Sequence, residues 1–407
     1  MAKVQYDRLV KVTEGLYSSA VKAGRNHRQA SEQSTAFLAE MFKAQEVKAN
    51  DFDLGRLFTE VFGWHHFQAA RSSNGLAHEV FEAAGAVSTA AFFNISGQIA
   101  YSAVLDAYQN EEFQFSKLIP EKQTPYNGEK IPGITPIGNE TLVVNEGEPF
   151  PKVGVSETYI EVAQPQKRGV SIDVTREAIF FDRTGVLLER CANVGWGLGA
   201  DDENRAIDCL IDEGTTATDA LTGSRYRWRG TSISTYGNNS GSHSWDNLEA
   251  SNALVSYVQL DAAEQLFNTI TDPDTAEPID LEPTHLVVTK QLEQTAFHIL
   301  NSLMIRRHLG GYATTGNLVE SEVNNPYKSK YQLLSTKRLA LRLATDTDWF
   351  LCNFKAWARM VNWPLQVKQA QTNSYMEYER DIVASYRADA RSNYSTLEPR
   401  LSVKSTA

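Results

Sequence analysis

The sequence VLLERCANVGWGLGADDENRAIDCLID spans residues 186–212 and predicts one long α-helix. It contains no Pro, and its apolar residues recur at three- and four-residue steps, which places them on one helical face. These residues are Leu187, Cys191, Val194, Leu198, Ala206 and Leu210. Such a helix would be roughly 40 Å long, beyond the usual length of about 8–20 residues in globular proteins. We therefore expect a spine that joins the strands before it to a separate mixed region after it.

The overall composition is that of a folded protein with a sizeable core. The chain has 407 residues, of which 42% are apolar, and this length suits two or three domains. A formal net charge of −11 argues against tight binding to phosphate backbones, which needs clustered Lys and Arg. No stretch approaches the roughly 18 consecutive apolar residues of a membrane span, and no signal peptide is predicted at the N-terminus.

The three cysteines, Cys191, Cys209 and Cys352, have no metal-binding or redox spacing. Two of them lie on the predicted spine, where Cys usually acts as a small apolar residue. This cysteine usage fits synthesis in a reducing cytoplasm.

The part of the chain before the spine divides into a helical region and a strand-rich arm. Residues 1–110 predict mostly helices, including a short amphipathic one over 99–108. Frequent Pro and Gly then break any helix between residues 113 and 151. Period-two alternation predicts strands near 158–162 and 170–174, and we expect these two strands to form a long antiparallel pair.

The part after the spine predicts a long surface loop, an α/β region and a strand-rich tail. Residues 214–247 are rich in Gly, Ser, Thr and Asn, which is typical of a functional loop. Within residues 248–365, helices are predicted at 252–270 and 291–303, and strands at 284–288, 339–343 and 349–351. Extended segments at 381–386 and 397–403 follow. We expect the C-terminal strand to complete the sheet begun before the spine, with residues 248–365 inserted between.

Motifs with possible chemistry have simpler structural interpretations. Gly195-Trp196-Gly197-Leu198-Gly199 resembles a dinucleotide fingerprint, but it lies inside a helical pattern and follows no strand, so close packing is the better interpretation. Asp201-Asp202-Glu203 occupies consecutive helical positions that do not converge, so we expect a solvated face or a partner for Arg205.

No metal, cofactor or catalytic site is predicted. The histidines most worth testing as ligands have none of the spacings typical of metal sites: His65, His66, His285, His298 and His308. No nucleophile elbow or phosphate-binding loop occurs in the sequence. The aromatic series of Trp349, Phe350, Phe354, Trp357 and Trp363 has no interleaved basic residues, so it predicts core or interface rather than a base-stacking surface.

Three stretches, taken in order, resemble one known family. The first runs from Phe115-Ser116-Lys117-Leu118-Ile119-Pro120 through Val170–Ile179 into the spine. The second is Asp272–Val288, followed by Leu292, Glu293 and Ala296. The third runs from Trp349-Phe350-Leu351 through Trp363–Val367 to Glu379–Arg387. Over roughly residues 110–404, their order and spacing are similar to the major capsid proteins of tailed bacteriophages, which have the HK-ninety-seven-type shell fold.

The resemblance implies an α+β fold of the phage-capsid type with five parts. A helical N-terminal region (1–110) would serve as an N-arm and scaffold-like segment, and a peripheral domain (111–213) would contain the spine helix. A surface loop (214–247), an axial domain (248–365) and C-terminal strands returning to the peripheral domain (366–407) would follow. The family's extended β-hairpin arm, the E-loop, would lie at about 136–158 and reach over the adjacent subunit. Its contact residues would be Glu146, Glu148, Pro149, Phe150 and Lys152.

The function implied is structural and not enzymatic. The chain would form pentamers and hexamers that build an icosahedral shell around double-stranded phage DNA, without binding that DNA tightly. Assembly would take place in the bacterial cytoplasm, with scaffold, portal and decoration proteins as possible partners and no membrane. In some relatives a protease removes an N-terminal segment, and in some a Lys and an Asn form isopeptide cross-links; residues 83–91 and Lys152 are the places to look here.

Two alternatives remain open on the sequence. One is a nanocompartment shell of the encapsulin type, with the same fold and a protein cargo, which the contents of the purified particle would reveal. The other is a soluble enzyme whose site is built from scattered residues, which would stop at a few subunits.

Overall fold

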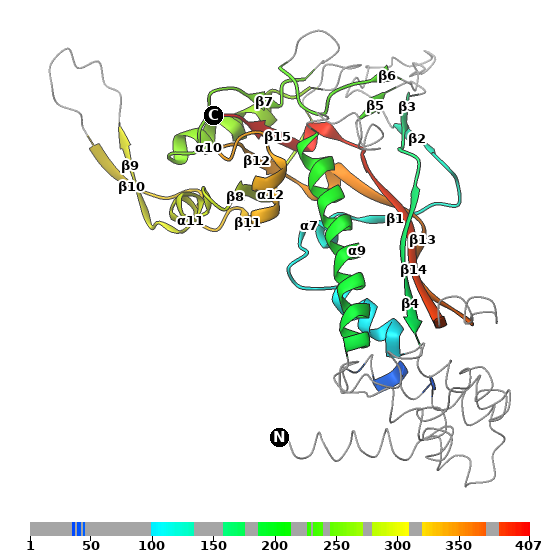
Figure 1. Cartoon of the computed structure of the whole chain (residues 1–407). Helices are drawn as coiled ribbons and strands as arrows, with labels where there is room; N and C mark the ends of the chain where they lie inside the picture. The colour runs from blue at the N-terminus through cyan, green and yellow to red at the C-terminus, as the bar shows by residue number, and fades with distance from the viewer. Residues whose placement is uncertain are drawn as a thin grey trace, which may run out of the picture. The chain divides into compact units, whose positions relative to one another are not determined.

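The structure is a computed structural model (Figure 1), and residues 1–407 form two compact units. None of the helices it describes is long and apolar enough to cross a membrane. The described residues are 35–36, 39–41, 44, 99–133, 158–175, 186–212, 226–228, 231–238, 245–271, 279–308, 320–371 and 382–407.

The first unit comprises residues 1–113, 167–202 and 363–391. It holds a helix over residues 99–108 and most of the predicted spine, helix α9 (Val186–Ile211). The sequence prediction of both helices is confirmed. On α9, Cys191 is fully buried, as the periodicity requires. The remaining elements in this unit are strand β4 (Gln166–Thr175) and parts of β13 (Trp357–Gln371) and β14 (Ile382–Thr396).

Two glycines of α9 allow the helix to approach the chain that precedes β1. A Cβ atom on Gly195 would lie 2.2 Å from the carbonyl oxygen of Val104. A Cβ atom on Gly199 would lie 2.5 Å from the ring of Phe113 and 2.8 Å from the carbonyl oxygen of Tyr108. Any side chain at these positions would collide with its neighbours, so only Gly permits this packing. The close-packing interpretation of Gly195 and Gly199 is therefore confirmed.

The second unit comprises residues 114–166, 203–362 and 392–407. Its centre is a five-stranded sheet in the order β11-β8-β12-β15-β7. These strands are β11 (Gln332–Thr336), β8 (His285–Thr289), β12 (Trp349–Cys352), β15 (Ser402–Ser405) and β7 (Leu248–Glu249). Residues of β8 alternate between two cores, since Leu286 and Val288 pack in one cluster and Val287 packs in the other. The sheet is therefore buried on both faces.

Different helices cover the two faces of this sheet. Helices α10 (Tyr257–Thr269) and α11 (Glu293–Asn301) pack in the cluster of Leu286 and Val288. The C-terminal part of α9 and helix α12 (Lys337–Arg342) pack in the cluster of Val287. A capping box defines the start of α10: the Ser256 side chain accepts from Val258 N, and the Gln259 side chain accepts from Ser256 N at 2.8 Å.

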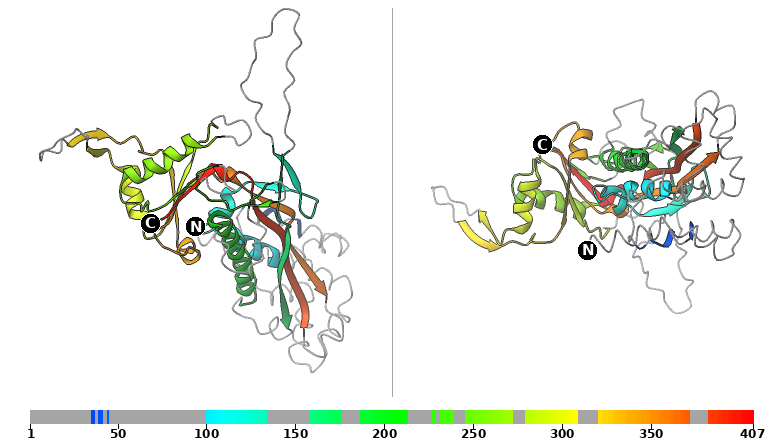
Figure 2. Two further views of the ribbon diagram at one scale, coloured as in Figure 1. Left: turned by 90° about the horizontal axis from the view of Figure 1, so that it is seen from above. Right: turned by 60° about the horizontal axis from the view of Figure 1, so that its bottom comes forward.

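This unit also contains a set of shorter helices and strands. Helix α7 (Phe115–Leu118) precedes β1 (Glu121–Gln123), which pairs in parallel with β13. A four-stranded sheet has the order β2-β3-β5-β6, with β2 (Lys130–Gly133), β3 (Thr158–Glu161), β5 (Arg227–Trp228) and β6 (Thr231–Ser232). Strands β9 (Met304–His308) and β10 (Glu320–Asn324) form an antiparallel pair that extends away from α11 in both views of Figure 2.

The expected antiparallel pairing of the two strands before the spine is wrong. Strand β3 pairs with β2 and β5, whereas β4 lies beside β14 in a sheet of order β1-β13-β14-β4. Strand β4 begins at Gln166, inside the segment expected to separate the pair. Period-two alternation identifies a strand and its two faces, but it carries no information about which strand is its neighbour.

The strand predicted at 339–343 is instead helix α12. Leu339 and Leu343 are buried while Leu341 is 83% exposed, which fits a helical step of four residues. The helix begins where the side chain of Thr336 accepts a hydrogen bond from Arg338 N. An alternating five-residue run is too short to distinguish the two structures.

Two further expectations about the later part of the chain need correction. The C-terminal strand β15 pairs with β12 and β7, so it does not complete the sheet that contains β4; β14 occupies that place. The described part of residues 214–247 is not a surface loop. It includes β5 and β6, and Tyr226, Trp245 and Asn247 are buried, because their aromatic and amide groups find partners inside the unit.

Candidate functional site

The base of the predicted E-loop is an antiparallel pair of strands. In the β2–β3 register, Lys130 lies opposite Glu161 and Gly133 lies opposite Thr158. Residues 134–157 therefore connect two paired strands, as a β-hairpin arm requires. The predicted contact residues, Glu146, Glu148, Pro149, Phe150 and Lys152, lie within this connection and outside the described residues.

Charged and amide side chains surround the base of this arm. The carboxylate of Glu161 lies 3.6 Å from Nζ of Lys130 and 3.9 Å from a guanidinium nitrogen of Arg227. Nζ of Lys130 also lies 4.3 Å from the ring centre of Tyr159. A pocket of about 400 Å³ opens here, and its lining includes Gln164 and Asn393. The ion pairs are partly exposed, so each contributes at most about 1 kcal/mol and their main role is orientation.

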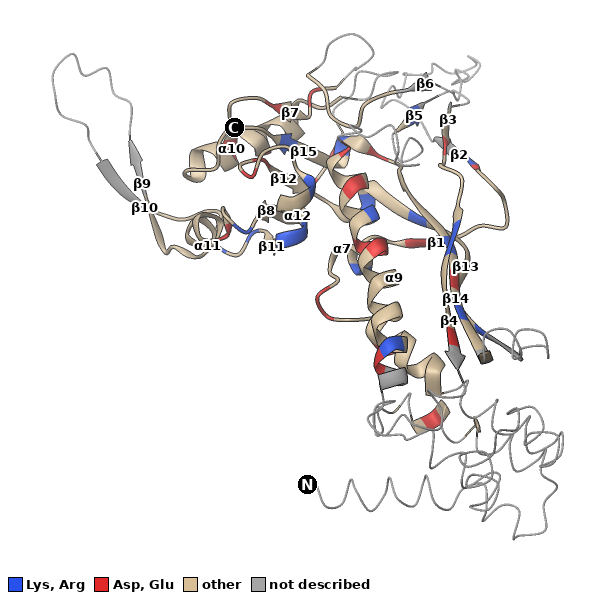
Figure 3. Ribbon diagram, viewed as in Figure 1, with Lys and Arg blue, Asp and Glu red and all other residues tan. Residues whose placement is uncertain are grey.

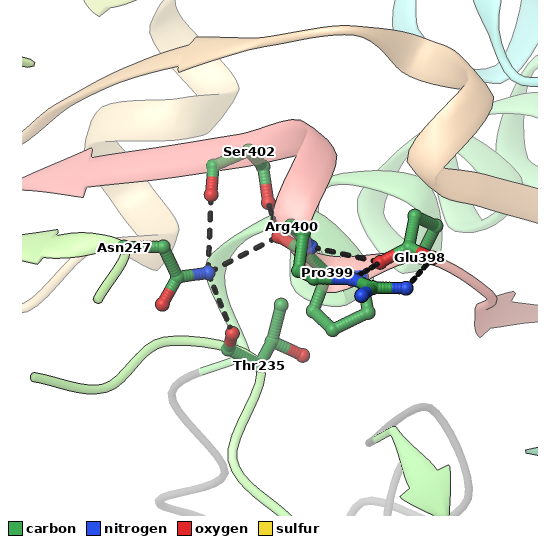
Figure 4. Close-up of polar contacts among 6 residues, drawn as sticks. All are labelled: Thr235, Asn247, Glu398, Pro399, Arg400 and Ser402. Atoms are coloured by element: carbon green, nitrogen blue, oxygen red, sulfur yellow. Dashed lines mark hydrogen bonds and ion pairs between the residues drawn. The ribbon is translucent and has the colours of Figure 1, made fainter. Parts of the chain in front are cut away.

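A buried amide ties the segment after the spine to the C-terminus of the chain (Figure 4). Asn247 is fully buried, and its Nδ2 donates to the carbonyl oxygens of Thr235 at 2.9 Å, Pro399 at 3.1 Å and Ser402 at 3.1 Å. Its Oδ1 accepts from Gly237 N at 2.9 Å. One side chain therefore satisfies polar groups of two distant segments, which fixes them together. The sequence pattern of this region indicated only a loop.

Two of the three carboxylates in the acidic cluster of α9 are buried, whereas the side chain of Asp201 is 39% exposed and its Oδ1 lies 2.9 Å from Nη1 of Arg168. Glu203 is 1% exposed, and its carboxylate accepts hydrogen bonds from the backbone N–H groups of Gln114, Phe115 and Ser116 at 2.9–3.0 Å. Asp202 is 3% exposed and accepts from the Tyr108 hydroxyl at 2.9 Å. The expectation of a solvated face is wrong for Asp202 and Glu203, because their carboxylates accept hydrogen bonds from residues about ninety positions earlier, which the local sequence does not reveal.

The aromatic and cysteine residues are structural in the described parts of the chain. Trp349, Phe350 and Trp357 are fully buried, as predicted for core residues. All three cysteines are free and buried, and burial raises the pKa of the Cys191 thiol to about 11. Within the residues the structure describes, no group of three or more His, Cys, Asp or Glu side chains has the arrangement of a metal site.

The region with the five-stranded sheet presents large apolar side chains to solvent. Leu341 on α12 is 83% exposed, and Phe297 on α11 is 55% exposed. Other exposed apolar residues occur before and on α10 and at the start of β9: Val255, Val258, Leu303 and Met304. Isolated exposed apolar residues are normal, but several large ones on one region are typical of surfaces that bind other proteins.

Comparison with protein families identifies the chain. The family model described as phage capsid protein matches residues 158–405, which is more than half of the sequence. This chain belongs to the phage capsid protein family. A search of curated proteins finds no match.

Several solved structures are similar to this chain. The capsid of the cyanophage P-SCSP1u has a TM-score of 0.46 at 11% identity, over 72% of this chain and 88% of that one. The Gordonia phage Cozz structure has a TM-score of 0.43 at 13% identity, over 72% and 86%. The virus-like particle from Pyrococcus furiosus has a TM-score of 0.40 at 10% identity, over 75% and 96%.

Family membership supports the first of the functions considered from the sequence. The chain is a structural major capsid protein that self-assembles into a shell and is located in the virion capsid. The family is a structural one, and the match to it does not favour the encapsulin-like alternative.

Proposed function

We propose that this capsid protein forms pentamers and hexamers that close into an icosahedral shell around double-stranded DNA. The observation that carries this proposal is the β2–β3 pair, which holds residues 134–157 as the connection of a hairpin. An arm of that length reaches roughly 40 Å when extended, far enough to lie across a neighbouring subunit.

Each subunit would contribute distinct surfaces to its neighbours. Such heterologous contacts generate closed rings when the rotation between subunits closes, and the rings then close into a shell. The E-loop residues Glu146, Glu148, Pro149, Phe150 and Lys152 would contact the adjacent subunit. Residues 111–213 would form the peripheral domain and residues 248–365 the axial domain around the rotation axes. Strand β14 would return the chain to the peripheral domain before β15 joins the five-stranded sheet.

No single contact in such a shell needs to be strong. Every subunit is held at several surfaces at once, so the second and later contacts form at a high effective concentration. Extended arms add area, and obligate assemblies commonly bury about 2,000–5,000 Å² per interface. A shell of moderate contacts can therefore be stable as a whole.

The charge of the chain suits a container rather than a DNA-binding surface. The formal net charge is −11, and Lys and Arg residues lie scattered among Asp and Glu over the described elements (Figure 3). Tight, sequence-independent binding to DNA needs many phosphate contacts from clustered basic residues. The shell would enclose DNA without holding it tightly. Assembly in the host cytoplasm, with scaffold, portal and decoration proteins, completes the proposal.

Shortening the E-loop between Gly147 and Gly154 tests whether this loop holds neighbouring subunits together. The shortened chain should give fewer particles, and those that form should dissociate at a lower temperature, because the arm would no longer reach its neighbour. Particle yield by sedimentation and thermal dissociation by light scattering are the measurements. Replacing the same residues with a Gly/Ser segment of equal length separates loss of reach from loss of contact residues. If the shortened chain gave particles with unchanged yield and heat resistance, the loop would not hold neighbouring subunits together.

A further inference from the structure

The first residue of a central strand in the five-stranded sheet is a histidine. Strand β8 lies between β11 and β12, and it begins at His285. Gln332 lies opposite His285 on β11, and Cys352 lies opposite it on β12. The next three residues of β8, 286–288, are fully buried and pack in two cores. His285 therefore lies where β8 enters the interior of the sheet.

Neighbouring side chains hold the imidazole of His285 on two sides. Its Nδ1 lies 2.7 Å from the hydroxyl oxygen of Thr284, within hydrogen-bond distance. Its ring centre lies 4.8 Å from that of Phe354, at an interplanar angle of 84°. Phe354 is itself buried and packs against the rings of Phe115 and Trp357. The imidazole as a whole is half-buried, but Nε2 is shielded from water, so a proton there would bring charge into this packing.

The described elements packed against His285 offer little to balance a positive charge. Strand β11 carries no titratable side chain, and Cys352 on β12 is a fully buried thiol whose pKa burial raises, so it is neutral at acid pH. The charged residues nearest in sequence are Glu282, before β8, and Lys355, on the 3-10 helix η3 (Phe354–Ala356), and both are exposed. Helices α11 and α12 begin beyond the opposite ends of β8 and β11.

This environment favours the neutral form of the ring. Burial lowers the pKa of the His285 imidazole below its usual value of 6.5, and a hydrogen bond with the Gln332 side chain, which acts in the opposite direction, is the smaller effect. As the pH falls, the unfolded chain therefore takes up a proton before the folded chain does. The stability of the folded state is complete above about pH 6.5 and decreases below it.

We propose that His285 makes the five-stranded sheet sensitive to acid. The neutral ring, held by Thr284 and Phe354, keeps the beginning of β8 between β11 and β12. The protonated ring would place a poorly compensated charge against buried aromatic side chains, so the beginning of β8 would separate from its neighbours. This sensitivity belongs to the single subunit, so it does not depend on the proposed shell.

Replacement of His285 by a residue that stays neutral tests the proposal. His285→Gln keeps a polar group beside Thr284 but cannot take up a proton. Between pH 7.5 and pH 5.5, the unfolding equilibrium constant of unassembled wild-type subunits should rise several-fold more than that of the variant, and at most about tenfold more. Urea unfolding measures both constants. His298→Gln, at an exposed position of α11, is the matched control and should keep the pH dependence of the wild type. Identical pH profiles of His285→Gln and the wild type would overturn the proposal.

Hydrogen exchange of the wild-type subunit gives a second measurement that needs no substitution. After correction for the intrinsic effect of pH on exchange, the amides of residues 286–289 should lose protection several-fold between pH 7.5 and pH 5.5. The amides of residues 189–199 in α9, which belong to the first unit, should lose less. Unchanged protection of residues 286–289 would overturn the proposal. An equal loss in both segments would also overturn it, because the effect of acid would then not start at β8.

Discussion

At the scale of single residues, one buried carboxylate holds the start of α7. Glu203 accepts three backbone hydrogen bonds, from Gln114, Phe115 and Ser116, and helix α7 is only four residues long. The first N–H groups of a helix have no partner inside it, so an acceptor from elsewhere must satisfy them. A carboxylate is a strong acceptor in this position, because the bonds are charge-assisted.

Removing that carboxylate should destabilise the subunit. Glu203→Ala leaves three N–H groups without their acceptor and should lower the free energy of unfolding by roughly 3 kcal/mol. Glu203→Gln keeps an oxygen acceptor and should cost about half as much. Urea unfolding of unassembled subunits measures both changes. Glu189→Gln serves as the control, because Glu189 lies at an exposed position of α9, the helix that carries Glu203. This substitution should change the free energy of unfolding little. Equal stability of Glu203→Ala and wild type would mean that water replaces the cap.

At Asn247, the substitution closer in shape, Asn247→Asp, should destabilise the subunit more than Asn247→Ala. Asn247→Ala removes a buried amide and should cost roughly 2–4 kcal/mol. Asn247→Asp keeps the shape but places an acceptor oxygen against the carbonyl oxygens of Thr235, Pro399 and Ser402, so it should be less stable than the alanine variant. Unfolding midpoints of the two variants decide the order. The reverse order would show that the donated hydrogen bonds contribute little.

The buried thiols predict a pH dependence at the alkaline end. Burial raises the pKa of Cys191 from 9.0 to about 11, and burial raises the pKa values of Cys209 and Cys352 as well. Well below pH 9 all three thiols are protonated in both the folded and the unfolded state, so they contribute no pH dependence there. As the pH rises from 9 towards 11, the unfolded chain ionises first, so the free energy of unfolding should fall by up to about 1.4 kcal/mol per pH unit for each thiol.

Unfolding midpoints between pH 8 and pH 11 measure this loss. Cys191→Ala should show a smaller loss than wild type over the same range, because one buried thiol has been removed, while the other alkaline groups titrate equally in both proteins. Thiol reagents at pH 8 should react slowly with the folded subunit and rapidly in urea, since the thiolate is the reactive form. Identical pH profiles for the two proteins would contradict the assignment of the effect to Cys191.

At the scale of elements, Gly195 and Gly197 on α9 differ in their surroundings, and a matched pair of alanine substitutions tests this difference. Gly195→Ala places a Cβ atom 2.2 Å from the carbonyl oxygen of Val104 and should cost roughly 1–3 kcal/mol of folding free energy. Gly197→Ala meets no neighbour among the residues that the structure describes and should stabilise the subunit by up to about 1 kcal/mol. Thermal melting of unassembled subunits compares the two. If both variants melted at the same temperature, the packing of α9 described here would be wrong.

The sequence predicts elements well where a long pattern repeats. The periodicity of residues 186–212 is sufficient to place α9, and the buried aromatic residues near Trp349 are read correctly as core. The pairing partners of strands cannot be predicted in this way, because the alternation in β3 and β4 is the same whichever strands lie beside them. The strand predicted at the position of helix α12 is wrong, since a run of five residues fits both the two-residue period of a strand and the 3.6-residue period of a helix.

The candidate site is less predictable than the fold because its partners are distant in sequence. Nothing near Glu203 in the chain indicates that it caps residues 114–116, and nothing near Asn247 indicates its bonds to Pro399 and Ser402. The Gly-Trp-Gly-Leu-Gly pattern did indicate close packing, but not that one of its three glycines faces outward. Such assignments depend on three-dimensional neighbours, which a local pattern does not contain.

At the scale of the whole molecule, family membership and architecture lead to one central claim, that this chain builds a closed shell from copies of itself. The family model covers residues 158–405, and the long helix α9 and the five-stranded sheet suit a subunit with several neighbours. None of the residue-scale contacts would by itself require an assembly.

The size of the purified wild-type protein tests this claim most directly. Light scattering and negative-stain imaging of the recombinant chain, alone and with the proposed scaffold protein co-expressed from the same phage, measure the assembly state. We predict closed particles of megadalton mass and uniform diameter. A protein that stays a monomer or a small oligomer under both conditions would contradict the claim.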